Sequence, residues 1–139
     1  MRQGLTLPRD LADALRRHAE AAAPREACGL LGAIPGSAVA TTFRPARNVA
    51  EVAYLYRMDP GEVVRLVDQM TAAGEGLLAI VHSHTASPAT PSPTDRREAA
   101  WPDAIHVIVS LDHRVPEPER IRAWQIRDAA AEEVSLDLG

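Results

Sequence analysis

Apolar and polar residues follow two periodicities along this chain, and the change from one to the other predicts helices and strands in mixed order. Helical spacing predicts a helix over residues 8–23, and Asp59 followed by Pro60, a typical cap and first-turn pair, predicts another over 58–73. A third, shorter helix is predicted over 93–101. Apolar, β-prone runs predict strands over residues 27–32, 37–44, 53–58, 77–84, 105–111, 120–127 and 133–138.

This mixed order predicts an α/β (α+β) sandwich in which helices flank one curved, mixed, mostly antiparallel sheet. With 139 residues, of which 46% are hydrophobic, the chain is long enough to bury a core of its own. No internal repeat and no long linker divides the sequence, so a single domain over residues 1–139 is predicted. Only 4% of the residues are aromatic, so this core must be mainly aliphatic.

The charge balance and the distribution of apolar residues exclude several classes of partner. The formal net charge of −4 leaves no basic surplus, which argues against nucleic acid as a partner. No apolar run reaches transmembrane length, and the N-terminal residues lack the apolar core of a signal peptide. We therefore expect no membrane partner and a cytoplasmic location. The single cysteine, Cys28, excludes an intramolecular disulfide.

The run VHSHTASPATPSPTD contains three residues that could bind one metal ion. His82 and His84 follow an apolar, β-prone run, and residues two apart on an extended strand point to the same face. Asp95 would bring a carboxylate from the far side of a proline-rich loop. Two histidines and one carboxylate leave a fourth tetrahedral position for water, which is typical of a catalytic zinc site rather than a structural one.

The end of the same run also has a purely structural interpretation. In SPTD, Ser92 is a good helix N-cap, proline suits the first helical position, and Asp95 completes a capping box. Both interpretations can hold together, because a cap would fix the direction of the Asp95 carboxylate. Glu26, between the first predicted helix and an apolar strand, is the best candidate for a general base. From the residues alone, a solvated glutamate beside Arg25 is the favoured explanation.

The two motifs together resemble the JAMM (MPN+) metalloprotease family. They are Glu26 followed by Ala-Cys-Gly-Leu-Leu-Gly, and the downstream His-Ser-His-x7-Ser-x2-Asp. The resemblance extends over most of the chain, including the first helix, the loop around Asn48 and the second helix. It implies a JAMM/cytidine-deaminase-like sandwich and a peptidase or isopeptidase that acts on ubiquitin-like proteins.

The resemblance also implies roles for individual residues. His82, His84 and Asp95 become ligands of one Zn2+ per chain, which activates a water molecule as the nucleophile. Glu26 becomes the general acid/base, and Ser92 supplies a hydroxyl to the oxyanion. Asn48 matches a recurrent asparagine of the family that would support the active-site loop, although a turn-forming Asn is an alternative.

One departure from the common family pattern narrows the expected substrate. Many members have Pro after the second histidine, whereas this chain has Thr85. Together with PSPTD and the stretch PDAIHVIVS, this resembles the bacterial Mec-type peptidases. That subgroup releases cysteine from the C-terminal Gly-Gly of a ubiquitin-like sulfur-carrier protein. We expect such a carrier as the partner, and the sequence leaves a homo-oligomer open.

Other residues that could carry chemistry have simpler structural explanations. Cys28 fits a small buried thiol better than a fourth ligand, and His106, within an apolar strand, fits a core histidine. His113 is expected in a turn. Trp101 and Trp124 are expected to pack in the core or at an edge, and a role in gripping a carrier tail is the alternative.

Three other functions compete with the peptidase. A non-catalytic MPN-type scaffold would normally lack one or more metal ligands, and none is missing here. RadC-like DNA-associated proteins share a similar His-x-His run, but the acidic balance of this chain argues against that role. An amidohydrolase barrel needs roughly 250 residues, so the chain is too short. Metal analysis of the protein separates the scaffold from the enzyme, and salt-sensitive DNA binding would favour the RadC-like role.

Overall fold

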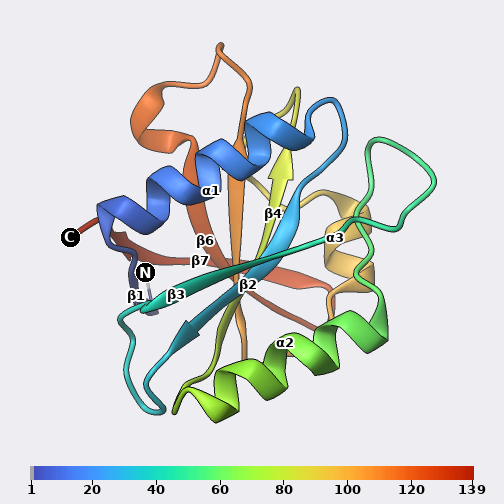
Figure 1. Cartoon of the computed structure of the whole chain (residues 1–139). Coiled ribbons are helices and arrows are strands. Elements are labelled where there is room, and N and C mark those ends of the chain that lie inside the picture. The colour runs from blue at the N-terminus through green and yellow to red at the C-terminus, as the bar shows by residue number, and fades with distance from the viewer. Residues whose placement is uncertain (1) are drawn as a thin grey trace.

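The computed structural model describes residues 2–139, which form one seven-stranded sheet with helices on both faces (Figure 1). The sheet has the strand order β1-β7-β6-β5-β4-β2-β3. The elements, in chain order, are β1 (Arg2–Thr6), α1 (Arg9–Ala22), β2 (Cys28–Ala33), β3 (Thr42–Ala46), α2 (Pro60–Ala72), β4 (Gly76–His84), α3 (Pro93–Glu98), β5 (Ile105–Ser110), the 3-10 helix η1 (Glu117–Glu119), β6 (Ile121–Arg127) and β7 (Ala130–Asp137).

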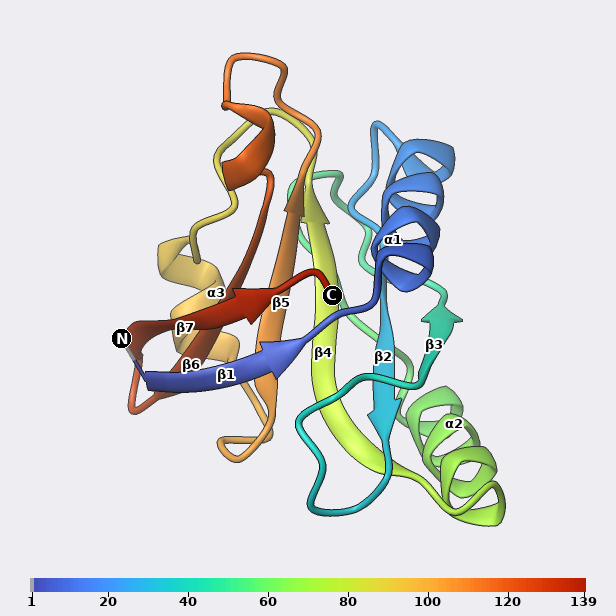
Figure 2. The same cartoon turned by 90° about the vertical axis from the view of Figure 1, so that its left-hand side faces the viewer.

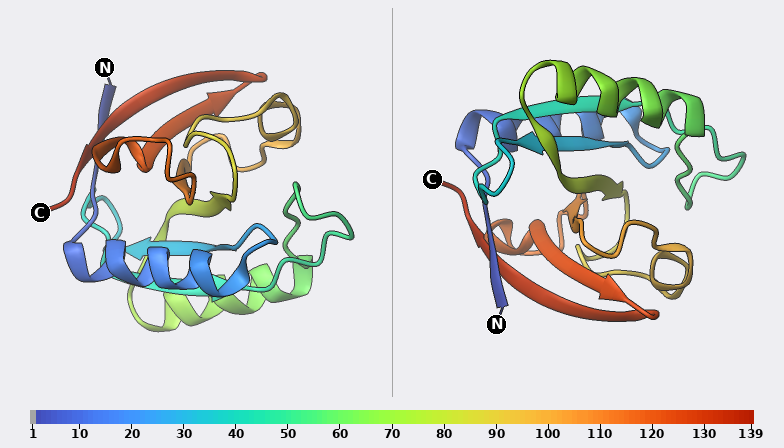
Figure 3. Two further views of the ribbon diagram at one scale, coloured as in Figure 1. Left: turned by 90° about the horizontal axis from the view of Figure 1, so that it is seen from above. Right: turned by 90° about the horizontal axis from the view of Figure 1, so that it is seen from below.

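Four of the six neighbouring strand pairs are antiparallel, and the pairs β1–β7 and β4–β5 are parallel. The sheet curls, with β1 and β7 on one side of the molecule and β2 and β3 on the other (Figures 2 and 3). This confirms the predicted curved, mixed, mostly antiparallel sheet. β4 lies between β2 and β5. The residues at the end of β4 are therefore flanked by two strands that lie far apart in the sequence.

Two apolar layers cover the two faces of the sheet. On one face, Leu15 and Ala19 of α1 pack with Val81 of β4 and Val107 of β5. On the other face, Leu66 and Met70 of α2 pack with Cys28, Leu30 and Ile80. Burial of these side chains from water is the main force that holds the helices against the sheet. Within residues 2–139, no helix is long and apolar enough to cross a membrane.

Two expectations about the elements are wrong, wholly or in part, and one strand was not expected. Residues 53–58 form a turn and a loop rather than a strand, because Asn48 binds the backbone on both sides of that segment. The strand expected over 37–44 begins at Thr42, since residues 38 and 40 hydrogen-bond instead with Thr6. β1 was not expected. It pairs with β7 so closely that a Cβ on Gly4 would lie 1.6 Å from the Ser135 carbonyl oxygen.

Candidate active site

His82 and His84 lie at the carboxyl end of β4, on the sheet face that α2 and α3 cover. Their side chains share this face because alternate residues of a strand point the same way. In the sheet register, His82 lies between Cys28 of β2 and Ile108 of β5. Both imidazoles are buried, and the ring of Tyr56 stacks on His82 with centroids 4.4 Å apart.

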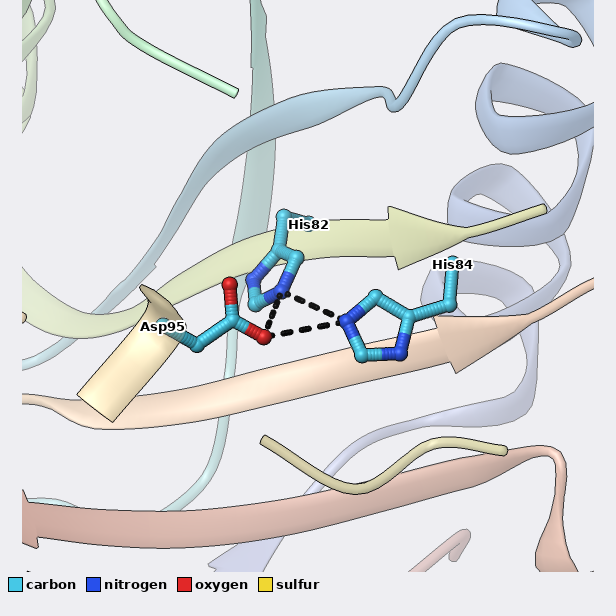
Figure 4. Close-up of side chains that lie close together, drawn as sticks. All are labelled: His82, His84 and Asp95. Atoms are coloured by element: carbon cyan, nitrogen blue, oxygen red, sulfur yellow. Dashed lines mark hydrogen bonds and ion pairs between the residues drawn. The ribbon is translucent and has the colours of Figure 1, made fainter. Parts of the chain in front are cut away.

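The start of α3 directs Asp95 towards the two histidines. The Ser92 side chain accepts a hydrogen bond from the Asp95 backbone N–H at 3.0 Å, and the Ser92 N–H donates to Asp95 Oδ2 at 2.9 Å. This is the capping box expected from SPTD. Because the box holds Oδ2 itself, the cap fixes the oxygen that faces His82 and His84 (Figure 4).

The three ligand atoms have the spacing of a tetrahedral metal site. Nε2 of His82 and Nε2 of His84 are 3.3 Å apart, and Asp95 Oδ2 lies 3.2 and 3.0 Å from them. Zinc held at about 2.0–2.1 Å by tetrahedral ligands keeps those ligands about 3.3 Å apart. Among the described residues, these three are the group of metal-ligand type that converges in this way.

The hydrogen-bond partners of the rings support a cation at this point. Nδ1 of His84 lies 2.7 Å from the Pro88 carbonyl oxygen, which can only accept, so Nδ1 carries the hydrogen. In the neutral ring, Nε2 therefore presents a lone pair towards Asp95 Oδ2 and His82. With the hydrogen of His82 also on Nδ1, three lone pairs converge on one point, and a metal ion there would bind all three. The donor set and its spacing fit zinc.

The electrostatics favour the metal-binding forms of Asp95 and His82. Burial acts to raise the pKa of Asp95, but the contacts from His82 and His84 hold that pKa well below its usual value, so the carboxylate is ionised. Burial lowers the pKa of His82, which keeps this ring neutral. Burial also acts to lower the pKa of His84, but Asp95 and the Pro88 carbonyl together raise it.

Glu26 lies between α1 and β2, directly before the strand that flanks β4. Its side chain is only 7% exposed, and its Oε1 has no hydrogen-bond partner among the described residues. Burial raises the pKa of Glu26 to about 7, with His84 lowering it and Asp95 raising it by smaller amounts. A carboxyl group whose pKa is near neutral can both take and return a proton at ordinary pH. The solvated glutamate considered above is therefore wrong.

Two polar side chains hold the Glu26 backbone in place. The Ala27 N–H donates to Ser83 Oγ at 2.7 Å, and the Asn48 side chain donates to the Glu26 carbonyl at 2.9 Å. Asn48 also donates to the Leu55 carbonyl and accepts from the N–H groups of Ala50 and Arg57. Asn48 thus ties the loop that carries Tyr56 to the residue expected to act as base.

Ser92 and Thr85 lie in different surroundings. Ser92 is half-buried beside Asp95, and its hydroxyl oxygen accepts from the Asp95 N–H, which leaves the hydroxyl hydrogen free to donate. Thr85 lines a separate cavity of about 490 Å³ together with Ala23 and Ser110. The structure therefore brings Ser92 to the ligand cluster, whereas Thr85 is next to the cluster only through its chain neighbour His84.

A largely apolar cavity of about 460 Å³ opens beside the ligand cluster. Asp95 and Tyr56 form part of its wall, and Trp101 lies at its rim with 47% of its surface exposed. Trp124, in contrast, is buried and donates to the Ala89 carbonyl. The sequence did not point to Tyr56 or Ser83 as parts of the site. Ser83 lies inside the His-x-His motif, but its role depends on a strand 56 residues away along the chain.

This geometry agrees with a known family. Residues 8–127 match the family described as prokaryotic homologs of the JAB domain. The chain belongs to that family.

Relatives of this JAB-domain chain include peptidases. A CysO-cysteine peptidase of Mycobacterium tuberculosis is 38% identical over 96% of the chain and 90% of the relative. A desampylase of Haloferax volcanii is 35% identical over 80% of the chain and 84% of the relative. The chain is a JAMM-type peptidase, and the matches confirm the resemblance to the JAMM (MPN+) family and its bacterial Mec-type subgroup.

Solved structures agree with the fold. Protein DSY2949 of Desulfitobacterium hafniense superposes with a TM-score of 0.83 at 30% identity, over 95% of the chain and 90% of that protein. A structure described as a JAMM metalloprotease-like zinc site in the proteasome and signalosome superposes with a TM-score of 0.57 at 18% identity, over 99% and 97% of the two chains. The second likeness concerns the fold alone.

Proposed function

We propose that this chain is a zinc-dependent peptidase that hydrolyses the amide bond after the C-terminal Gly-Gly of a ubiquitin-like sulfur-carrier protein. The released group is cysteine or another C-terminal extension. The observation that carries the proposal is the convergence of His82, His84 and Asp95 at tetrahedral spacing beside a buried glutamate. The relatives named as a CysO-cysteine peptidase, a desampylase and a probable TtuB-protein conjugate cleaving protease support the substrate class.

Each residue of the site would have a separate role in the hydrolysis. Nε2 of His82, Nε2 of His84 and Oδ2 of Asp95 would hold one zinc ion, which when bound lowers the pKa of a water molecule and polarises the scissile carbonyl. Glu26 accepts the proton of the attacking water and donates it to the departing amine. The Ser92 hydroxyl donates to the carbonyl oxygen as that oxygen becomes negative.

The surroundings of the site support an extended carrier tail as the substrate. The apolar cavity beside Asp95 adjoins the ligand cluster, so a chain that crosses it reaches the ligand atoms. A Gly-Gly tail has no side chains and so fits a narrow path, and the rest of the carrier would dock outside the cavity. Cytoplasmic location and the oligomeric state of the chain stay predictions from the sequence.

Mass spectrometry of a carrier–cysteine conjugate tests the function directly. Incubation with the zinc-loaded protein is expected to yield the carrier ending in Gly-Gly and free cysteine. Glu26→Gln is expected to bind one zinc ion per chain, as the wild type does, and to lose at least a thousandfold in turnover, because a buried base is removed and no ligand is. Wild-type turnover in Glu26→Gln would exclude the assigned base, and turnover without zinc would exclude the metal mechanism.

A further inference from the structure

The two proposed histidine ligands differ in how their second ring nitrogen is satisfied. The Nδ1–H of His84 donates to the Pro88 carbonyl, whereas Nδ1 of His82 is buried and has no partner among the described residues. A histidine that binds zinc through Nε2 must carry its hydrogen on Nδ1, and ligand histidines almost always donate that hydrogen to an acceptor. His82 therefore lacks an acceptor that His84 has.

One further buried histidine has the complementary deficiency. His106 is 2% exposed, and its Nε2 has no hydrogen-bond partner among the described residues. The backbone of Ala100 hydrogen-bonds its ring. Because Nε2 has no partner, the hydrogen bond with Ala100 is made by Nδ1, which donates its hydrogen to the Ala100 carbonyl oxygen. Nε2 of the neutral ring is then an acceptor that has no donor.

The sheet brings these two rings to one face of neighbouring strands. In the parallel pair β4–β5, His106 is opposite Ile80 and His82 is opposite Ile108, so the two histidines are diagonal neighbours. Diagonal neighbours in a sheet have Cα atoms about 7–8 Å apart, within reach of aromatic side chains. Burial lowers the pKa of His106 to about 4, and an unfavourable interaction between the protonated forms of His106 and His82 is the second cause, which is consistent with rings that lie close together.

We propose that His106 is a positioning residue of the metal site, whose Nε2 accepts the Nδ1–H of His82 through one water molecule. The two nitrogens make no direct hydrogen bond, and a water molecule can accept from one and donate to the other. The bridge fixes the ring direction and the tautomer of His82 and so strengthens zinc binding. The inference rests on the proposed role of His82 as a ligand.

Zinc affinity, measured by chelator competition, tests this role without any substrate. His106→Phe fills the space between Ile80 and Trp124 but has no acceptor, and it is expected to weaken zinc binding about 10–100-fold. His106→Gln carries an acceptor at about the reach of Nε2 and is expected to bind within about threefold of the wild type. His113→Phe, in the exposed turn after β5, is the matched control and should bind like the wild type.

Thermal unfolding of the zinc-free variants separates positioning from packing. His106→Phe is expected to unfold near the wild-type temperature, because the ring keeps most of the buried volume and the exposed Ala100, which loses its donor, can hydrogen-bond to solvent instead. Proton–nitrogen NMR of the histidine ring N–H groups, recorded on the zinc form, should show a slowly exchanging His82 Nδ1–H in the wild type and in His106→Gln. The same signal should be absent in His106→Phe. Wild-type zinc affinity in His106→Phe, or no recovery in His106→Gln, would overturn the role of His106. A wild-type protein that binds no zinc would overturn the metal site itself.

Discussion

At the scale of single residues, Glu26, the proposed base, lowers the stability of the fold. Its carboxyl group is buried, and one of its oxygens has no partner among the described residues. Burial raises its pKa from 4.5 to about 7. Such a group suits proton transfer near neutral pH, but its ionised form is held in the folded chain at a cost.

The pH dependence of unfolding follows from that raised pKa. In the unfolded chain Glu26 loses its proton near pH 4.5, and in the folded chain near pH 7. Stability is therefore lost as the pH rises from about 4.5 through 7, because the folded state then holds a buried charge. Glu26→Gln should stabilise the zinc-free protein by about 1–3 kcal/mol at pH 8, since one pKa unit corresponds to about 1.4 kcal/mol, and by much less at pH 4.

Urea denaturation of the zinc-free protein at both pH values measures this difference. Glu20→Gln, at an exposed position of α1, controls for the removal of one negative charge. An equal gain from Glu26→Gln at pH 4 and pH 8 would contradict the assigned origin of the effect.

At the scale of elements, the short helix α3 combines a structural and a proposed chemical role at its N-cap. Ser92 caps the helix and fixes Asp95, and the same hydroxyl has a hydrogen to donate towards the ligand cluster. The Ser92 backbone N–H, which holds Asp95 Oδ2, remains whatever the side chain is. The two roles can therefore be separated by substitution.

Ser92→Ala should lower kcat about 10²–10³-fold, the usual effect of losing one oxyanion donor. It should also reduce stability by about 1 kcal/mol through the lost cap. Zinc affinity should change less than kcat, because Asp95 keeps its bond from the Ser92 N–H. Ser92→Thr retains both the cap and the hydroxyl, and it should recover most of the rate. If kcat falls only in proportion to zinc occupancy, Ser92 acts as a cap alone.

The elements also show which parts of the site could be predicted from the sequence. The apolar run of β4 and the cap of α3 are local signals, so the sequence could indicate that His82, His84 and Asp95 come together. The loop at 53–58 could not be predicted, because its composition favours a strand and only the hydrogen bonds of Asn48 keep it from forming one. The same hydrogen bonds position Tyr56 on His82. β1 was missed for a similar reason, since its partner β7 is at the other end of the chain.

At the scale of the whole molecule, the strand order brings segments that are distant in sequence to the ligand cluster and to the cavity beside it. β4 brings the histidines, the link between α1 and β2 brings Glu26 near them, and the chain between α3 and β5 brings Trp101 to the cavity rim. Trp101 is a large apolar side chain with 47% of its surface exposed, next to the path that a carrier tail would take. Exposed aromatic residues of this kind frequently anchor a protein partner.

Trp101→Ala is therefore expected to raise KM for a carrier conjugate about 5–30-fold, which corresponds to about 1–2 kcal/mol, with kcat nearly unchanged. The reason is that the side chain lies outside the ligand cluster and so contributes to binding rather than to chemistry. Trp101→Phe should keep KM within about threefold, and Val39→Ala, an exposed apolar residue away from the cavity, should behave as the wild type. Steady-state kinetics with the intact conjugate measure all three. A loss confined to kcat would instead mean that Trp101 shapes the ligand cluster, and the carrier would then have to approach the site from another side.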